Sequence, residues 1–426
     1  MISIFLHPIF QKKTLTLHRK IDKDSMGDTK ERFIILDLLR GIALLGICLA
    51  NFPEFALYTF QSSDTVAAMP TAGIDTVVKY LQYILVDGKF YTIFSLLFGI
   101  GFSIILSNAS KNRKNGLLIF YRRMALLFFI GLFHLIFLWA GDILILYAFL
   151  GFFLPLFRNL SNKKLLVSTA ILLLFPILVD SCITLFDWNL SAPVIKATKH
   201  LHDRFGITDD TFPVWLAEAT SYAEVLKFNV AGSCIRMQEF IEGNRAFKVM
   251  GLFVFGYYIG KNRLYSTLNE QKKILHKIRN CCFLTGFPLS VLYAWNAMNG
   301  YPYSLPVTAT LYAVSVFPFS LAYISTCCLY YIKNKERSIF SRIAAPGKMA
   351  LTNYLMQSVF GIILFYGIGF GMGAKIGLIH IEWIALSVFL VQIVYSNGWL
   401  RYFRYGPVEW GWRILTYQKM LKLKIN

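Results

Sequence analysis

The sequence predicts an all-α fold, a polytopic bundle of about ten transmembrane helices with both chain ends on the cytoplasmic side. Of its 426 residues, 56% are hydrophobic and 15% are charged, whereas about 25% are charged in a soluble domain. The apolar residues form runs long enough to cross a bilayer. Most Lys and Arg residues fall in alternate connecting segments, as they do on the cytoplasmic side of multi-pass proteins.

The charge distribution also bears on partners and location. A net charge of +20 that is concentrated in the predicted cytoplasmic segments indicates orientation and contact with anionic lipid, and we expect no nucleic-acid partner. The seven cysteines lie mostly in apolar runs, without a CxxC pair or zinc spacing, so they are predicted to be packing residues. We expect a multi-pass protein of the inner, cytoplasmic membrane, in contact with membrane lipids and open to oligomer formation.

The expected organisation has five parts. They are a cytoplasmic extension at 1–31, an N-terminal transmembrane half with five spans at 32–186, an extracytoplasmic loop with short helices at 187–245, a C-terminal transmembrane half with five spans at 246–400, and an interfacial cytoplasmic tail at 401–426. The tail alternates aromatic and basic residues, a pattern typical of a helix at headgroup depth. The expected spans lie near 32–51, 90–107, 117–139, 143–157, 164–186, 246–260, 280–299, 306–331, 350–371 and 376–396.

The first span carries two charges within an otherwise apolar stretch. Asp37 and Arg40 stand three residues apart, which places them on one helix face where they can neutralise each other. Charged residues inside a membrane usually pair or line a polar cavity. Two interpretations therefore stay open: an ion pair that fixes helix register, and a pair that serves a ligand.

Small residues indicate where helices approach closely. Gly41 and Gly46 interrupt the first span, and Ser95, Gly99 and Ser103 stand four apart in the second. Such spacing is typical of tight helix–helix packing in membranes. In the loop at 187–245, the sequence HLHD (200–203) is compatible with a metal site or with solvated histidines; we favour the second and expect no metal.

Five stretches resemble one family of membrane proteins. They are LDLLRGIALLGICLAN (36–51), KFYTIFSLLFGIGFS (89–103), RRMALLFFIGLFHLIFLWAGDILILYA (122–148), GKMALTNYLMQS (347–358) and RYGPVEWGWRILTY (404–417). In this order they are similar to the YeiB-like proteins, a family of uncharacterised function within the transmembrane acyltransferase superfamily.

That resemblance implies transfer of an acyl group from a cytoplasmic carrier, such as acyl-coenzyme A, to an envelope sugar, lipid or small metabolite whose identity stays open. Guanidinium groups pair with phosphate bidentately, so cytoplasmic-side residues would hold the carrier. The residues expected to do so are Asp37, Arg40, Arg122, Arg123 and Arg404. The residues expected near the acceptor are Asn51, Glu54, His134 and Asp142.

One departure from the superfamily affects the mechanism. Where the broader families that share LRGIA end the first helix with a catalytic histidine, this chain has Asn51, which cannot act as a general base. Catalysis would therefore need His134 as the base, with Asp142 or Glu54 orienting its ring. The alternatives are that His134 is a hydrogen-bonded packing residue, and that the protein is a non-enzymatic transporter or lipid-binding protein that retains the fold.

Overall fold

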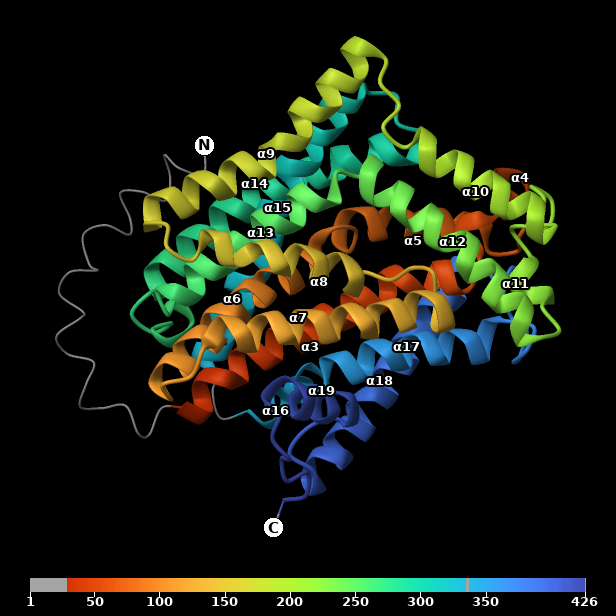
Figure 1. The fold of residues 1–426 in the computed structure, drawn as a ribbon. Helices are drawn as coiled ribbons and strands as arrows, with labels where there is room; N and C mark the ends of the chain where they lie inside the picture. The colour runs from red at the N-terminus through yellow and green to blue at the C-terminus, as the bar shows by residue number, and fades with distance from the viewer. Residues whose placement is uncertain (1–28, 335–336, 426) are drawn as a thin grey trace.

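The computed structural model describes residues 29–334 and 337–425. The expected extension at 1–31 lies almost entirely outside them. The described part is built from helices (Figure 1), with a single isolated bridge between Phe403 and Lys424 and no named strand. This confirms the predicted all-α fold.

Seven described helical stretches are long and apolar enough to cross a membrane. They are Ile34–Phe55, Ala72–Lys111, Gly116–Leu138, Asn162–Phe186, Lys272–Met298, Leu305–Lys333 and Leu378–Tyr402. An eighth is possible if Ser338–Lys348 and Ala350–Phe365, which meet at a 74° bend, form one broken span. The expected count of about ten was higher because it included Leu144–Phe157 and Arg245–Lys261, both shorter than the roughly 20 residues of a typical span.

The N-terminal half contains six longer helices. They are α3 (Thr29–Phe55), α5 (Ala72–Leu85), α6 (Lys89–Lys111), α7 (Gly116–Phe133), α8 (Leu144–Phe153) and α9 (Asn162–Phe186). The short α4 (Ser63–Ala67) precedes α5. Gly88 separates α5 from α6 with a φ of 75°, a left-handed conformation that glycine adopts without a steric penalty.

The segment expected at 187–245 does contain helices. They are α10 (Ala192–Phe205), α11 (Trp215–Glu218) and α12 (Tyr222–Glu242). A capping box begins α12, since the Glu224 carboxylate accepts from the backbone N–H of Ser221 at 3.2 Å. Its extracytoplasmic location stays a prediction, as does the cytoplasmic location of both chain ends.

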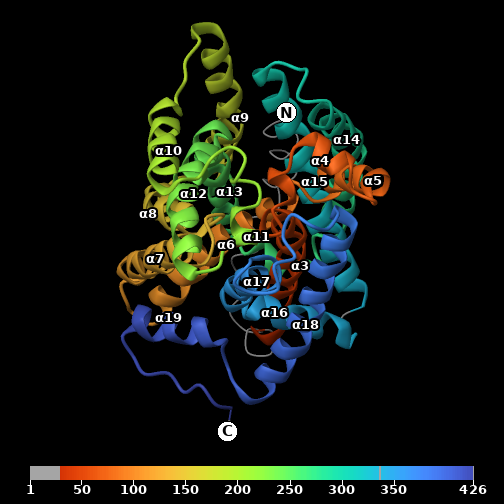
Figure 2. The same cartoon turned by 90° about the vertical axis from the view of Figure 1, so that its right-hand side faces the viewer.

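The C-terminal half consists of α13 (Arg245–Lys261), α14 (Lys272–Met298), α15 (Leu305–Lys333), α16 (Ser338–Lys348), α17 (Ala350–Phe365), α18 (Leu378–Tyr402) and α19 (Pro407–Tyr417). In Figure 2, α7, α8, α9, α12 and α13 lie on one side of the molecule, and α3, α14, α15 and α18 lie on the other. The two sides meet where α6 packs on α13 and where α15 packs on α9.

Glycines allow the close helix contacts on which this arrangement depends. A Cβ at Gly256 of α13 would lie 2.1 Å from the backbone oxygen of Leu96, and one at Gly99 of α6 would lie 2.1 Å from that of Phe253. At Gly41 of α3 it would lie 2.1 Å from the backbone oxygen of Ile343. Small residues in both predicted faces therefore sit at tight helix contacts.

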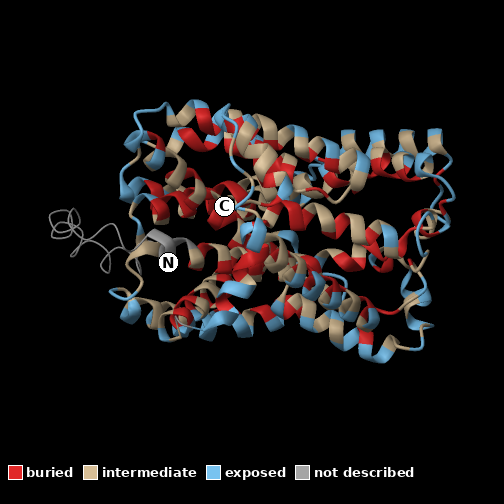
Figure 3. Cartoon of the chain, turned by 90° about the horizontal axis from the view of Figure 1, so that it is seen from below, coloured by how far each residue is buried: buried red, intermediate tan, exposed pale blue. Residues whose placement is uncertain are grey.

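The outer surface of the bundle is apolar. Figure 3 shows buried residues along the central helices, with exposed ones at the helix ends and outer faces. Large side chains such as Phe129, Leu178, Leu284 and Val394 are more than half exposed, which a water-soluble surface would not tolerate in such numbers. The protein is a multi-pass membrane protein.

Candidate functional site: a cavity along the first helix

A large cavity of about 1900 Å³ runs through the bundle. It follows α3 from Asp37 to Glu54, a distance of about 25 Å at the helical rise, compared with roughly 30 Å for a bilayer core. Exposed residues line both of its ends: Asn108 and Tyr417 at one, Asp187 and Tyr301 at the other. The cavity is therefore accessible from both ends of the bundle.

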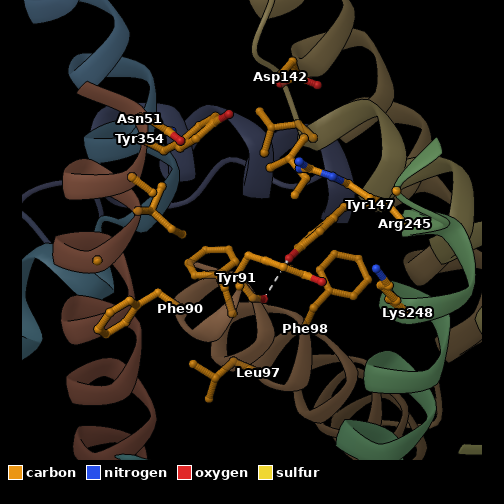
Figure 4. A pocket seen from close by; sticks show the side chains of 18 of the residues that line it. Asn51, Phe90, Tyr91, Leu97, Phe98, Asp142, Tyr147, Arg245, Lys248 and Tyr354 are labelled. Carbon is orange, nitrogen blue, oxygen red and sulfur yellow. Dashed lines mark hydrogen bonds between the residues drawn. The ribbon is translucent and has the colours of Figure 1, made fainter. Parts of the chain in front are cut away.

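The middle of the cavity is apolar and aromatic. Phe90, Tyr91, Leu97 and Phe98 of α6 line it (Figure 4), together with Tyr147 of α8. Pockets of this kind, with a few polar groups at defined places, are typical of sites for organic ligands. The apolar wall suits a hydrocarbon chain or another flexible apolar group.

One end, which we call the basic mouth, is lined by Arg40, Arg123, Lys348 and Arg413. The Asp37–Arg40 pair predicted from the sequence forms here, with 2.6 Å between Oδ1 and Nη1. Both side chains keep some exposure, 20% and 28%, because they face the cavity. The pair can thus neutralise itself and still contact a ligand.

The other three cations of the basic mouth lack a carboxylate partner within 4.0 Å among the described residues. The guanidinium of Arg123 lies 3.6 Å from the ring centroid of Trp412, and that of Arg413 lies 4.9 Å from the ring of Tyr405. Glu409 lines the same mouth, but its carboxylate accepts from the backbone N–H and hydroxyl of Thr352. Unpaired cations at a cavity mouth favour an anionic ligand.

Two residues expected in this group lie elsewhere. Arg122 does not line the cavity, and its Nη1 donates to the Thr416 carbonyl at 3.3 Å. Arg404 is exposed and also lies outside the cavity lining. Adjacent residues on a helix point about 100° apart, so only Arg123 of the Arg122–Arg123 pair faces inward.

His134 is buried in a hydrogen-bonded row of three side chains. Its Nδ1 lies 2.8 Å from Asp142 Oδ1, and its Nε2 lies 2.7 Å from Ser358 Oγ. The carboxylate only accepts, so Nδ1 carries a proton, and in a neutral ring Nε2 accepts from the Ser358 hydroxyl. Asp142 Oδ2 is held by the backbone N–H of Ile145 at 2.8 Å.

This row has the hydrogen-bond order of a Ser–His–Asp triad, but its histidine and its serine are closed to the cavity. His134 is 0% exposed and Ser358 is 1% exposed, and neither lines the cavity. Tyr354 does line it, with its ring centroid 5.0 Å from the imidazole. Both ring nitrogens of His134 are thus occupied by protein partners and no ligand atom reaches them in this conformation.

The structure separates the other residues expected near the acceptor. Asn51 and Asp142 both line the cavity, at the same end as Tyr354 (Figure 4). Glu54 also lines it but does not contact His134. Its Oε2 accepts from Arg236 Nη2 at 2.9 Å.

Arg236 links α12 to the end of α3 and was not among the site residues expected from the sequence. Its Nη1 donates to Glu239 Oε2 at 2.5 Å, and its guanidinium lies 5.6 Å from the ring centroid of Trp139. Burial disfavours the charged form of Arg236 and by itself lowers its pKa. The carboxylates of Glu54 and Glu239 together have the larger effect, so the pKa of Arg236 is raised above its usual value. We call this end, lined by Glu54, Arg236, Glu239, Glu242 and Asp187, the mixed mouth.

Among the described residues, no group of three or more His, Cys, Asp or Glu side chains is placed to hold a metal ion. In the HLHD stretch, the ring of His202 packs instead on Phe212, with 5.6 Å between ring centroids.

The known proteins that this chain resembles are described as uncharacterised. Residues 259–419 match a family model described as a protein of unknown function, DUF418. The chain is 29% identical to the uncharacterised protein YxaH of Bacillus subtilis, over 91% of this chain and 95% of that protein. It is 26% identical to an uncharacterised 39.9 kDa protein from the amylase 3′ region of Bacillus acidopullulyticus, over 93% and 97% of the two chains.

The chain is also 27% identical to the uncharacterised protein YeiB of Escherichia coli, over 91% of this chain and 96% of that protein. No solved structure matches it. The similarity to these relatives extends over nearly the whole chain. The chain is thus similar over nearly its whole length to uncharacterised proteins, YxaH and YeiB among them, and its C-terminal part matches the DUF418 model.

Proposed function

We propose that the protein is a transporter of the cytoplasmic membrane that binds an amphiphile with an anionic head in the cavity and carries it between the two sides of the membrane. The observation that carries this proposal is the continuous cavity, about 1900 Å³ in volume, accessible at both ends of the bundle. A non-enzymatic transporter or lipid-binding protein of this fold was one of the two alternatives that the sequence left open.

The lining supports the proposed ligand chemistry. Aromatic and aliphatic side chains in the middle suit an acyl or prenyl chain. Arg123, Lys348 and Arg413 at the basic mouth have no carboxylate partner among the described residues, and arginine binds phosphate oxygens through paired donors. The burial of His134 also favours this proposal over catalysis, because the best candidate base does not face the cavity.

Acyl transfer from a coenzyme A-type carrier is the second candidate. One specific observation favours it. Arg40 and Arg123 at the basic mouth line the same cavity as Asn51 and Asp142, which lie toward the opposite end. A carrier held at the basic mouth could extend its acyl arm along the aromatic middle. Acyl transfer through His134 would additionally require the ring to leave Ser358 and turn past Tyr354.

A reconstitution experiment tests both candidates. The purified protein is placed in liposomes that contain NBD-labelled phosphatidylglycerol, and dithionite quenching reports movement of label between the leaflets. We expect faster movement than in protein-free vesicles and faster than with NBD-phosphatidylcholine. The same preparation is incubated with acetyl-coenzyme A, and release of free thiol is measured.

Adjacent arginines provide a matched control. Arg123→Gln removes a cation of the cavity, whereas Arg122→Gln removes the neighbouring charge that faces away from it. Losing one charge-assisted hydrogen bond of about 1.5–3 kcal/mol should slow transport by about 10- to 100-fold in Arg123→Gln only. Equal rates in the two variants would contradict the transport proposal, and thiol release that depends on Arg123 would favour the acyltransferase.

A further inference from the structure

A second pair of cations faces the cavity, away from the basic mouth. Arg245 and Lys248 stand three residues apart in the first turn of α13, and both line the cavity. Figure 4 shows their side chains reaching from α13 toward the pocket, with Arg245 beside Tyr147. They lie at the level of Tyr91, the third residue of α6.

Neither cation has a carboxylate oxygen within 4.0 Å among the described residues. Nearby Asp180 is engaged with the side-chain amide of Asn244 at 2.7 Å. The ammonium of Lys248 lies 4.0 Å from the ring centroid of Tyr312, a cation–π contact. Within the described part of the chain, it donates no hydrogen bond. Two like charges on one helix face repel each other, and a shared anion would relieve that repulsion.

The surroundings of the pair are also suited to an anion. Arg245 and Lys248 lie in the first turn of α13, where the helix dipole is positive. The N-cap residue Asn244 makes no side-chain hydrogen bond to that turn. The facing wall carries hydroxyl groups, since Tyr91 and Tyr312 are joined at 2.7 Å, and Tyr147 lies 2.5 Å from Ser95 Oγ.

We propose that Arg245 and Lys248 form a second anion site that binds a phosphate group. A planar fork of donors beside a point charge suits a tetrahedral oxyanion, because arginine spans two of its oxygens while lysine contacts a third. The tyrosine rings next to the site suit the apolar part of the same ligand. The proposal rests on the proposed function, in which this phosphate is the ligand's head at a second position.

The two cation sites are separated along the cavity. The new site lies beside Tyr91, because Lys248 contacts the ring of Tyr312 and the hydroxyl of Tyr312 is hydrogen-bonded to that of Tyr91. The rings of Phe120 and Phe102 pack with 4.4 Å between their centroids. Because α7 runs antiparallel to α6, Arg123 lies one turn from Phe120 back toward the level of Tyr91. From Tyr91 to Phe102 along α6 is about 16 Å, and the step from Phe120 to Arg123 takes back about 4.5 Å. The two sites are thus about 12 Å apart along the bundle, so a single phosphate group cannot occupy both at once.

The test measures binding to the full-length protein in detergent by native mass spectrometry. The probes are short-chain phosphatidic acid, the matching diacylglycerol and inorganic phosphate. The variants are Lys248→Met, Arg245→Gln and the control Lys261→Met, which removes a lysine at the other end of α13 whose Nζ donates to the Leu160 carbonyl and which does not line this cavity.

We expect phosphatidic acid to bind more tightly than diacylglycerol, and Lys248→Met and Arg245→Gln each to weaken it by about 10- to 100-fold. Lys261→Met should bind as the unmodified protein does. Lys248→Arg, which keeps the charge, should retain most of the affinity, and this separates ligand binding from a folding defect. Displacement of phosphatidic acid by inorganic phosphate at similar concentration would identify the source as a soluble phosphorylated molecule.

Two results overturn the assignment: equal affinities in Lys248→Met, Arg245→Gln and Lys261→Met, or loss of binding in Lys248→Arg as complete as in Lys248→Met. The outcome is separable from that of the transport assay. If lipid movement depends on Arg123 but Lys248→Met binds and moves lipid normally, the second site is wrong and the function stands. If phosphate binding requires Lys248 but no lipid moves, the site stands and transport is wrong.

Discussion

Replacing His134 by alanine distinguishes a structural histidine from a catalytic one. The substitution removes both hydrogen bonds of the ring, at 2.8 Å to Asp142 and 2.7 Å to Ser358. Asp142 keeps the backbone N–H of Ile145 but loses its only other described partner. Ser358, 1% exposed, loses the acceptor of its hydroxyl.

The magnitude follows from these two bonds. A hydrogen bond to an ionised partner contributes about 1.5–3 kcal/mol and a neutral one about 1 kcal/mol, although side-chain bonds between membrane helices average only about 0.6 kcal/mol. We therefore expect His134→Ala to destabilise the protein by about 2–4 kcal/mol. Ser358→Ala loses the neutral bond alone and should cost about 1 kcal/mol.

The assay is thermal unfolding of the purified variants in one detergent, followed by the loss of the monodisperse peak in size-exclusion chromatography. A structural histidine predicts a clear loss of stability in His134→Ala and a smaller loss in Ser358→Ala. A His134→Ala protein that is as stable as the unmodified one, but has lost ligand movement or acyl transfer, would refute this reasoning. The general-base interpretation would then regain its support.

Three further predictions concern other parts of the bundle. Arg40→Ala should lower the free energy of unfolding by about 1 kcal/mol, because Asp37 and Arg40 face the cavity and their ion pair is partly solvated. The double change Asp37→Asn with Arg40→Gln should lower it by less. A double variant that is less stable than Arg40→Ala would mean that the two residues do not neutralise each other. Gly256→Ala should destabilise the contact with α6 by about 1–3 kcal/mol, whereas Gly101→Ala, with open space around its Cβ position, should be near neutral in the same unfolding assay. Cysteine labelling should find the segment at 261–279 accessible only from the cytoplasm, and labelling from outside would contradict the predicted topology.

Short-range patterns were predictable from the sequence. The Asp37–Arg40 bond follows from a spacing of three on one helix, and Asp142 next to His134 follows from a short connection between two apolar runs. Gly99 appears at a tight contact because its spacing with Ser95 and Ser103 defines a helix face. Each of these depends on geometry within a few turns of chain.

Contacts between distant segments were not predictable in the same way. Ser358 meets His134 across 224 positions, and only the packing of α17 decides which residue of that helix does so. Arg245 and Lys248 stand at the start of an apolar helix, where basic residues commonly reach for lipid headgroups, so nothing in the pattern indicated that they face inward. Arg236 was missed because its partner Glu54 lies on another helix.

The separation of the two cation sites determines how the membrane voltage acts on a bound anion. A displacement of about 12 Å along the cavity covers about 40% of a bilayer core of roughly 30 Å. Moving one elementary charge across the whole membrane is worth about 2.3 kcal/mol per 100 mV, so each negative charge on the head gains about 0.9 kcal/mol per 100 mV over this step. With the predicted orientation, an inside-negative potential drives the head from Arg123 toward Lys248 and favours outward movement.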